Sequence, residues 1–289
     1  MSPFRGLFTG LLDDAAIFPP GDLPLAQAVP AHLAHRQSGY GDLVGPFVVG
    51  AATLDELAGV VDVLRPGSFD IALTVPAPSL TQALDEADRL PALRVVAVEV
   101  SVPDGMAPDE AVDLLRRRPV GDGFARSADD VAAVYVELPR DERRAPLLDA
   151  LASAGYAAKL RTGGLTRDAH PGEDELASAV VAAVRAGVPF KATAGLHHAF
   201  RNTDPRTGFE QHGFLNLLVA TAAARAGATT CEVARLLAEC DPERVLADVR
   251  EADPSVRASF RSFGTCSITE PVDELGDLGL LRDAAEVRA

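Results

Sequence analysis

Eight short apolar segments recur along the 289-residue chain, and a helical pattern lies between one segment and the next. Each segment is rich in Val, Leu, Ile or Ala, which is typical of a strand buried on both faces. The segments are Leu11–Ile17, Pro46–Ala51, Asp70–Val75, Leu93–Val100, Val131–Leu138, Tyr156–Arg161, Pro189–Ala194 and Ser259–Cys266. Because a helix between two strands returns the second strand parallel to the first, this alternation predicts one parallel sheet.

The helical patterns complete eight strand–helix units. They cover Pro24–Gln37, Thr53–Leu64, Ser79–Leu90, Ala107–Arg117, Arg143–Ala154, Glu173–Ala186 and Gly213–Ala226, with an extra helix at Cys231–Val249 before the last strand and a closing helix at Glu270–Val287. Eight units predict a (β/α)8 barrel in one domain spanning residues 1–289. The alternative is an open doubly wound sheet, but no Gly-x-Gly-x-x-Gly sequence follows the first strand, where such sheets bind dinucleotides. Pro119–Ser127 is expected to form a surface loop.

The net charge and the length of the apolar runs indicate which kinds of partner to expect. The chain has 27 Lys and Arg against 42 Asp and Glu, a net charge of −15, so we expect no nucleic-acid partner. The longest apolar run, Phe214–Ala224, is too short to cross a bilayer, so no membrane role is expected. Three cysteines without a Cys-x-x-Cys spacing argue against a disulfide framework and favour the cytoplasm. A helix over Phe214–Ala224 would be apolar nearly all round, so either the Cys231–Val249 helix or a second subunit of a homo-oligomer should cover it.

Charged residues inside the predicted strands are informative, because a barrel interior is packed and its exterior is covered by helices. Several consecutive strands carry polar residues near their C-terminal ends, where barrel enzymes keep their active sites. They are Glu99 on the fourth strand, Glu137 on the fifth, Lys159 and Arg161 on one face of the sixth, and Lys191 and Thr193 on one face of the seventh. The plainer alternative is that the acids only neutralise the cations in a buried network.

The two lysines on neighbouring strands indicate covalent chemistry. A lysine held in an apolar barrel beside another cation has its charged form disfavoured, so its pKa falls toward neutrality. A neutral amine is the nucleophile that Schiff-base chemistry requires. We therefore predict Lys159 and Lys191 as catalytic residues, with Glu99, Glu137 and Asp13 as further candidate catalytic residues.

Two motifs that contain these lysines resemble class I aldolases of the deoxyribose-phosphate aldolase type. Lys159-Leu160-Arg161-Thr162-Gly163-Gly164 is similar to the family's Lys-x-x-Thr-Gly motif on the sixth strand, and Lys191-Ala192-Thr193-Ala194-Gly195 is similar to its second lysine motif, on the seventh. The resemblance implies a (β/α)8-barrel lyase that makes or breaks a carbon–carbon bond. It further implies that Lys159 forms an imine with a carbonyl substrate, that Lys191 lowers the pKa of Lys159, and that no cofactor is required.

The chain departs from this family at several positions. Arg161 stands where the family has a small residue, Glu99 stands where it has Asp, and His197-His198 follows the second lysine motif. The likeness covers only short pieces of two strands, so it indicates a kind of chemistry and not a substrate. Lys191 stays open as an alternative nucleophile.

The substrate is expected to be a small carbonyl compound with a phosphate or carboxylate, bound at the ends of the sixth to eighth strands. The candidate binding residues are Arg161, Thr162, Gly163, Thr193, His197, His198, Gly264 and Ser267. Arg161 offers a bidentate contact to an anion. Its alternative role is to pair with Glu137.

Two other functions are left open by the sequence. His197 and His198, together with Glu99, Glu137 or Asp13, could bind a divalent metal in a metal-dependent lyase or isomerase. A barrel that binds a ligand without catalysis is the second alternative. It would be favoured if Lys159 and Lys191 were too far apart to share a substrate.

Overall fold

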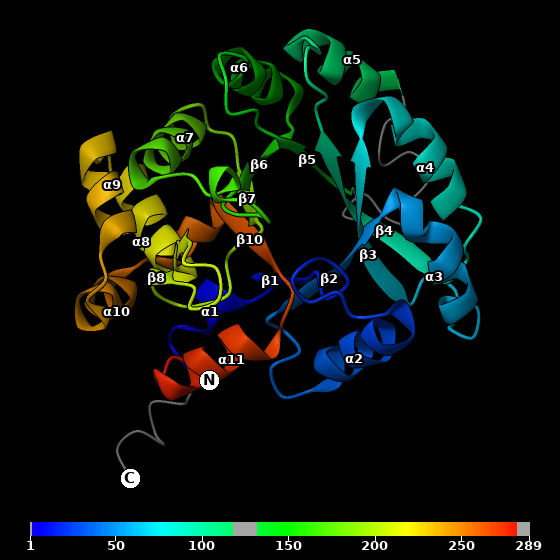
Figure 1. The fold of residues 1–289 in the computed structure, drawn as a ribbon, viewed down its shortest axis with the longest axis horizontal. Coiled ribbons are helices and arrows are strands. Elements are labelled where there is room, and N and C mark those ends of the chain that lie inside the picture. Colours follow the sequence, from blue (N-terminus) through cyan, green and yellow to red (C-terminus); the bar gives the residue numbers. More distant parts are fainter. Residues whose placement is uncertain (1, 118–131, 282–289) are drawn as a thin grey trace.

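Eight parallel strands form a closed barrel in the computed structural model, which describes residues 2–117 and 132–281. The strands are β1 (Leu12–Asp14), β2 (Val44–Gly50), β3 (Phe69–Pro76), β4 (Leu93–Ser101), β5 (Ala133–Glu137), β6 (Ala157–Arg161), β7 (Phe190–Thr193) and β10 (Phe260–Thr265). Each strand pairs with its neighbours in chain order, and β10 closes the ring by pairing with both β7 and β1 (Figure 1). The predicted (β/α)8 barrel is confirmed, and the open sheet is excluded.

Helices form an outer ring around these strands (Figure 1). They are α1 (Arg5–Phe8), α2 (Leu25–Gln37), α3 (Leu54–Val61), α4 (Leu80–Ala87), α5 (Pro108–Arg117), α6 (Arg144–Ala154), α7 (Glu173–Arg185), α8 (Phe214–Arg225), α9 (Thr230–Ala238), α10 (Pro242–Glu251) and α11 (Thr269–Asp277), with 3-10 turns η1 (Ala51–Thr53), η2 (Ala77–Ser79), η3 (Arg167–Ala169) and η4 (Pro254–Ala258). Gly155 follows α6 with φ of +72°, the left-handed conformation that ends a helix without a steric penalty. β6 then begins two residues later.

The barrel interior is built from small side chains as well as large ones. Outward-facing residues such as Ile71 and Leu73 of β3 belong to the main core between barrel and helices. A separate cluster inside the barrel consists of Val48, Ala72, Ala97 and Tyr135, with Ala15, Phe18, Ala133 and Ala157 packed against it. The many alanines leave space, and the long charged side chains of the candidate site occupy the interior beside them.

Two of the predicted helices differ from the structure. The helix expected at Cys231–Val249 is divided into α9 and α10, so two extra helices precede the last strand. The break lies at Asp241, whose side chain accepts a hydrogen bond from the Glu243 amide, and Pro242 occupies the first turn of α10. The closing helix ends at Asp277, well before the expected Val287, and the left-handed Gly279 (φ +71°) follows. Residues 282–289 and the loop expected at Pro119–Ser127 lie outside the described residues.

Helix α8 is buried on nearly every side, as its apolar sequence predicts. It packs against α7, α9 and α10, so helices of the same chain provide the cover (Figure 1). Across residues 2–117 and 132–281, no helix is both long and apolar enough to cross a membrane.

A short antiparallel hairpin lies between β7 and α8 and was not predicted from the sequence. It consists of β8 (Asn202–Thr203) and β9 (Glu210–Gln211). Asp204 fixes the turn, because its Oδ1 accepts hydrogen bonds from the backbone amides of Arg206 (2.7 Å) and Thr207 (3.2 Å). This hairpin contributes to the wall of the cavity described below.

Candidate active site

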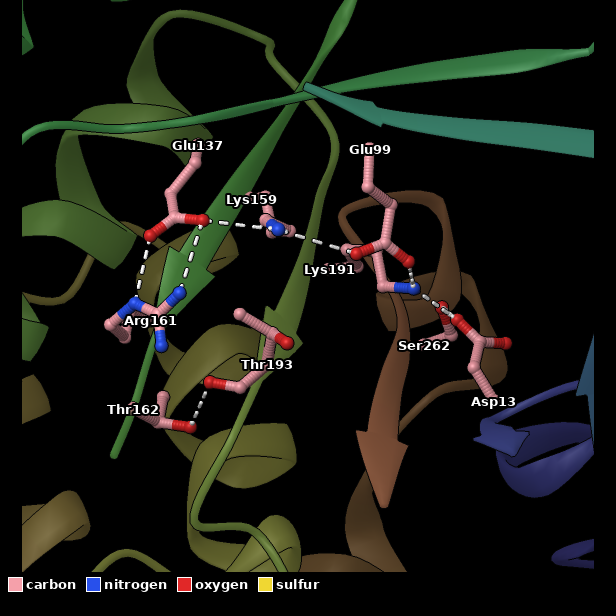
Figure 2. A network of polar contacts seen from close by, with 9 residues as sticks. All are labelled: Asp13, Glu99, Glu137, Lys159, Arg161, Thr162, Lys191, Thr193 and Ser262. Carbon is pink, nitrogen blue, oxygen red and sulfur yellow. Dashed lines mark hydrogen bonds and ion pairs between the residues drawn. The ribbon is translucent and has the colours of Figure 1, made fainter. Parts of the chain in front are cut away.

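Six side chains of alternating charge form a continuous row across the barrel interior, which we call the charge row. Figure 2 shows it running from β6 and β5 toward β1. In order, its members are Arg161, Glu137, Lys159, Glu99, Lys191 and Asp13. The strand pairing explains this order, since Glu137 is level with Lys159 on β6 and Lys159 is level with Lys191 on β7.

Lys159 lies at the centre of the row, between two carboxylates. Its Nζ is 3.0 Å from Glu137 Oε2 and 3.4 Å from Glu99 Oε2. Glu137 is also held by Arg161, whose Nε lies 2.8 Å from Oε1 and whose Nη2 lies 3.4 Å from Oε2. The position of the Lys159 amine is therefore set from both sides by charged contacts.

Lys191 lies deeper and is more tightly enclosed. Its Nζ contacts Glu99 Oε1 and is 2.5 Å from Asp13 Oδ2. Asp13 also accepts a hydrogen bond from Ser262 Oγ at 2.7 Å. Gly45 makes room for this carboxylate, because a Cβ there would lie 2.2 Å from Asp13 Oδ1. The neighbouring Asp14 is not part of the row, since it pairs with the buried His32 at 3.0 Å and accepts from the Ala16 amide.

The pKa of Lys191 moves in the opposite direction to the one expected from its sequence context. Burial alone would lower it, but the negative charges of Asp13 and Glu99 outweigh burial and raise it above the usual lysine value. The expectation considered the apolar surroundings and the neighbouring cation, and it left out the charges of these two carboxylates. Glu99 lies between the two ammonium groups and contacts both, so they are bridged by an anion and do not simply repel each other.

Two carboxylates of the row, Glu137 and Glu99, remain ionised at neutral pH. Burial would raise the pKa of Glu137, but the charges and hydrogen bonds of Lys159 and Arg161 lower it to about 2. The pKa of Glu99 is likewise lowered, because both lysines outweigh its burial. The pKa of Asp13 is raised instead, because its burial outweighs the charge and hydrogen bond of Lys191. Each cation of the row still contacts at least one acidic group, which is the pairing that buried charges need.

A cavity of about 820 Å³ opens above the charge row at the C-terminal ends of the strands. Lys159, Glu99 and Arg161 line it, whereas Lys191 does not. The Lys191 side chain is 1% exposed and that of Lys159 is 6% exposed. Of the two lysines, Lys159 is the one in contact with a space that could hold a substrate.

Arg161 is paired with Glu137 and also borders the cavity. Its guanidinium is paired with Glu137, as the plainer alternative held, and its side chain is 40% exposed and lines the cavity. Thr193, His197, His198, Gly264 and Ser267 also line the cavity. Thr162 and Gly163 are not among the lining residues and lie behind them. Thr162 Oγ1 lies within hydrogen-bonding distance of the carbonyl oxygens of Thr193 (3.2 Å) and Ala194, and Gly163 packs directly against Gly195.

Several cavity residues were not among the predicted site residues. Arg206 and Phe209 reach the cavity from the β8–β9 hairpin, His170 from the segment after β6, and Cys266 from the end of β10. A two-residue strand has no usable periodicity, so the hairpin left no pattern in the sequence. Arg206 forms no ion pair with any residue in the described ranges.

The histidines after β7 do not converge on the carboxylates of the charge row. His198 Nδ1 lies 2.7 Å from Glu274 Oε1 on α11, and His197 Nδ1 lies 3.6 Å from Glu270 Oε2 on the same helix. No group of three or more His, Cys, Asp or Glu side chains in the described part of the chain is arranged to hold a metal ion. The residues suggested for a divalent metal therefore do not fit one in this arrangement.

Comparison with known proteins adds little to this geometry. No protein-family model and no curated protein matches the sequence. One similar solved structure comes from work on the first monomeric dihydrodipicolinate synthase variant, with 12% identity, a TM-score of 0.39, and coverage of 89% of this chain and 81% of that chain. A likeness this distant carries no argument about activity. The barrel assignment rests on the strand pairing of the chain itself.

Proposed function

We propose that the protein is an aldolase-like lyase that makes or breaks a carbon–carbon bond of a small anionic carbonyl compound through an imine on Lys159. One observation carries this proposal. Lys159 is the lysine that both lines the cavity and has its amine fixed between two carboxylates, whereas Lys191 is enclosed beneath the cavity. The resemblance of the two lysine motifs to class I aldolases points to the same residue.

The charge row is suited to imine formation because that reaction conserves charge. The attacking amine is neutral, so the Lys159 ammonium first passes a proton to Glu99 or Glu137, and this proton is used again when water leaves. Overall, the ammonium and a carbonyl give an iminium ion and one water molecule, so the net charge between the two carboxylates is the same before and after the reaction. Both carboxylates are already oriented toward that position, and fixed charges of this kind stabilise a cationic intermediate without reorganisation. The iminium then accepts the electron pair of the adjacent carbon–carbon bond when that bond breaks.

Lys191 has a supporting role in this mechanism. It holds Glu99 and Asp13 in position through direct contacts and lowers the pKa of Glu99, and it stays protonated because the charges of Asp13 and Glu99 raise its own pKa. Glu99 in turn contacts Lys159. Lys191 thus acts on the reaction through Glu99, as a positioning residue.

Borohydride reduction tests the assignment of the nucleophile. We expect incubation with pyruvate or hydroxyacetone, followed by borohydride, to add the reduced probe to the peptide that contains Lys159. Lys159→Arg keeps the positive charge but cannot form an imine, so it should give no adduct while its circular dichroism is unchanged. An adduct found only on Lys191 would reassign the nucleophile. No adduct with any aldehyde or keto acid would overturn the proposal.

A further inference from the structure

We propose that His197 moves the proton at the carbon next to the imine carbon, and that Cys266 and Glu270 hold its ring in place. The inference rests on the proposed imine on Lys159, and it identifies the general base that this imine requires. An iminium accepts electrons, but a separate base must take the proton that leaves the substrate, and such transfers are typically worth about 10²–10⁴ in rate.

His197 has one ring edge held by the protein and the other free. Its Nδ1 lies 3.6 Å from Cys266 Sγ and 3.6 Å from Glu270 Oε2. Its Nε2 has no hydrogen-bond partner among residues 2–117 and 132–281. The ring is 13% exposed and lines the same cavity as Lys159. A bound substrate therefore shares one space with the amine and with this nitrogen.

Each carboxylate that lines the cavity already contacts another group of the protein. Glu99 contacts both lysine ammonium groups. Asp204 accepts two backbone hydrogen bonds in the hairpin turn, which lower its pKa. Glu270 itself lies beside His197. The pKa values of Glu99 and Asp204 are lowered by these contacts, so both are weak bases and poor candidates for removing a proton from carbon.

The other cavity groups are also unsuited. His170 Nε2 donates a hydrogen bond to the Gly164 carbonyl at 3.0 Å, and its Nδ1 is buried away from solvent. His198 is paired with Glu274. Burial raises the pKa of the Cys266 thiol to about 11, so it remains a neutral thiol. For His197, burial lowers the pKa, which leaves a neutral imidazole at neutral pH.

The proposed step is balanced within the site. The Nε2 lone pair takes the proton, the electrons of the carbon–hydrogen bond form the carbon–carbon double bond of an enamine, and the iminium nitrogen receives the π pair. His197 becomes an imidazolium. In the reverse direction it returns a proton to the same carbon, and the open cavity allows the imidazolium proton to exchange with solvent in between.

Deuterium exchange separates this step from imine formation. In D2O, the wild-type protein should incorporate deuterium at the carbons next to the carbonyl of pyruvate and hydroxyacetone, as followed by proton NMR. We expect His197→Gln to keep borohydride trapping on Lys159 within about threefold and to slow exchange by about 100-fold or more. His35→Gln is the matched control, because His35 lies on α2 outside the barrel and contacts Tyr40. It should leave both readouts unchanged.

Chemical rescue distinguishes proton transfer from a structural role. Added imidazole should restore exchange to a His197→Ala variant whose circular dichroism matches the wild type. Exchange at the wild-type rate in a His197→Gln protein that still traps pyruvate would overturn the inference and leave the imine on Lys159 standing. If the wild-type protein forms no adduct with these probes or with any aldehyde or keto acid, the proposed function fails and the inference fails with it.

Discussion

Lys191 is 1% exposed, and its ammonium group contacts the carboxylates of both Asp13 and Glu99. Taking these three charges out of water has a large cost, which their mutual contacts offset. The free energy of unfolding therefore depends on whether the set of three charges is complete. The complete set is tolerated, whereas a set that lacks Lys191 leaves the buried Asp13 without a cation and Glu99 with Lys159 alone.

We therefore expect Lys191→Met to lower the free energy of unfolding by about 3–5 kcal/mol, measured by urea denaturation. Adding Asp13→Asn to this variant should recover part of the loss, because it removes the buried carboxyl group that has lost its cation. The control is Arg244→Gln at a surface ion pair whose arginine is 73% exposed, where the change should stay below about 1 kcal/mol. A similar small loss for Lys191→Met would mean that its charge is not needed for folding.

Glu137 should make stability depend on pH. Its pKa is about 2 in the folded protein against an ordinary value of 4.5, because Lys159 and Arg161 outweigh its burial. A carboxyl with a lowered pKa stabilises the fold above its unfolded-state pKa, and this contribution is lost as the pH falls toward the folded-state value. The relevant window is therefore acidic, between about pH 5 and pH 2.

The comparison of wild type with Glu137→Gln measures this contribution. We expect the variant to be less stable at neutral pH by an amount on the order of 3 kcal/mol, and the difference to shrink as the pH is lowered through that window. Urea denaturation at constant ionic strength at several pH values gives both curves. A difference that does not change with pH would show that Glu137 does not titrate as described.

Among the elements, the segments after β6 and β7 meet at two glycines. A Cβ on Gly163 would lie 2.8 Å from Gly195 Cα and 3.0 Å from His170 Cε1, which is closer than side-chain atoms pack. The contact brings the Thr162 hydroxyl to the carbonyl oxygens of Thr193 and Ala194. It fixes the two loops beside Lys159 and Lys191 relative to each other.

Gly163→Ala should consequently destabilise the protein by about 1–3 kcal/mol, because the two backbones must separate. Gly59→Ala is the matched control with the opposite expected sign. It lies inside α3 with open space around its missing Cβ, and alanine is favoured there by about 0.5–1 kcal/mol. Thermal denaturation of the two variants measures both effects. Equal stability of the two would contradict the proposed close packing.

The β8–β9 hairpin places Arg206 at the cavity, where it has no ion-pair partner in the described part of the chain. Arg161, the arginine expected to bind an anion, is already paired with Glu137. We expect Arg206→Gln to raise the concentration of pyruvate needed for half-maximal trapping by about tenfold or more, and to leave that of the uncharged hydroxyacetone unchanged. Equal weakening with both probes would show that Arg206 does not recognise the anionic group.

For the whole molecule, the net charge of −15 is a repulsive contribution that the paired charges in the barrel do not cancel. Dissolved salt screens exposed charges far more than buried ones. We expect the melting temperature to rise when sodium chloride is increased from about 0.01 M to about 0.15 M. Calorimetry at fixed pH measures this shift. A falling melting temperature would mean that attractive surface ion pairs outweigh the overall repulsion.

The sequence by itself determined the order of the eight barrel strands and the strand ends that carry the charged residues, but not the β8–β9 hairpin. Local periodicity and turn residues specify both, and eight strand–helix units favour closure. The prediction of one helix over Cys231–Val249 was wrong, because the cap at Asp241 and the proline that follows it divide that helix in two. Only the tertiary structure decided that Lys159 lines the cavity while Lys191 lies sealed below it, and that the pKa of Lys191 rises. The reason is that burial and charge depend on partners distant in the chain: the carboxylates that surround Lys191 come from β1 and β4, 178 and 92 residues away.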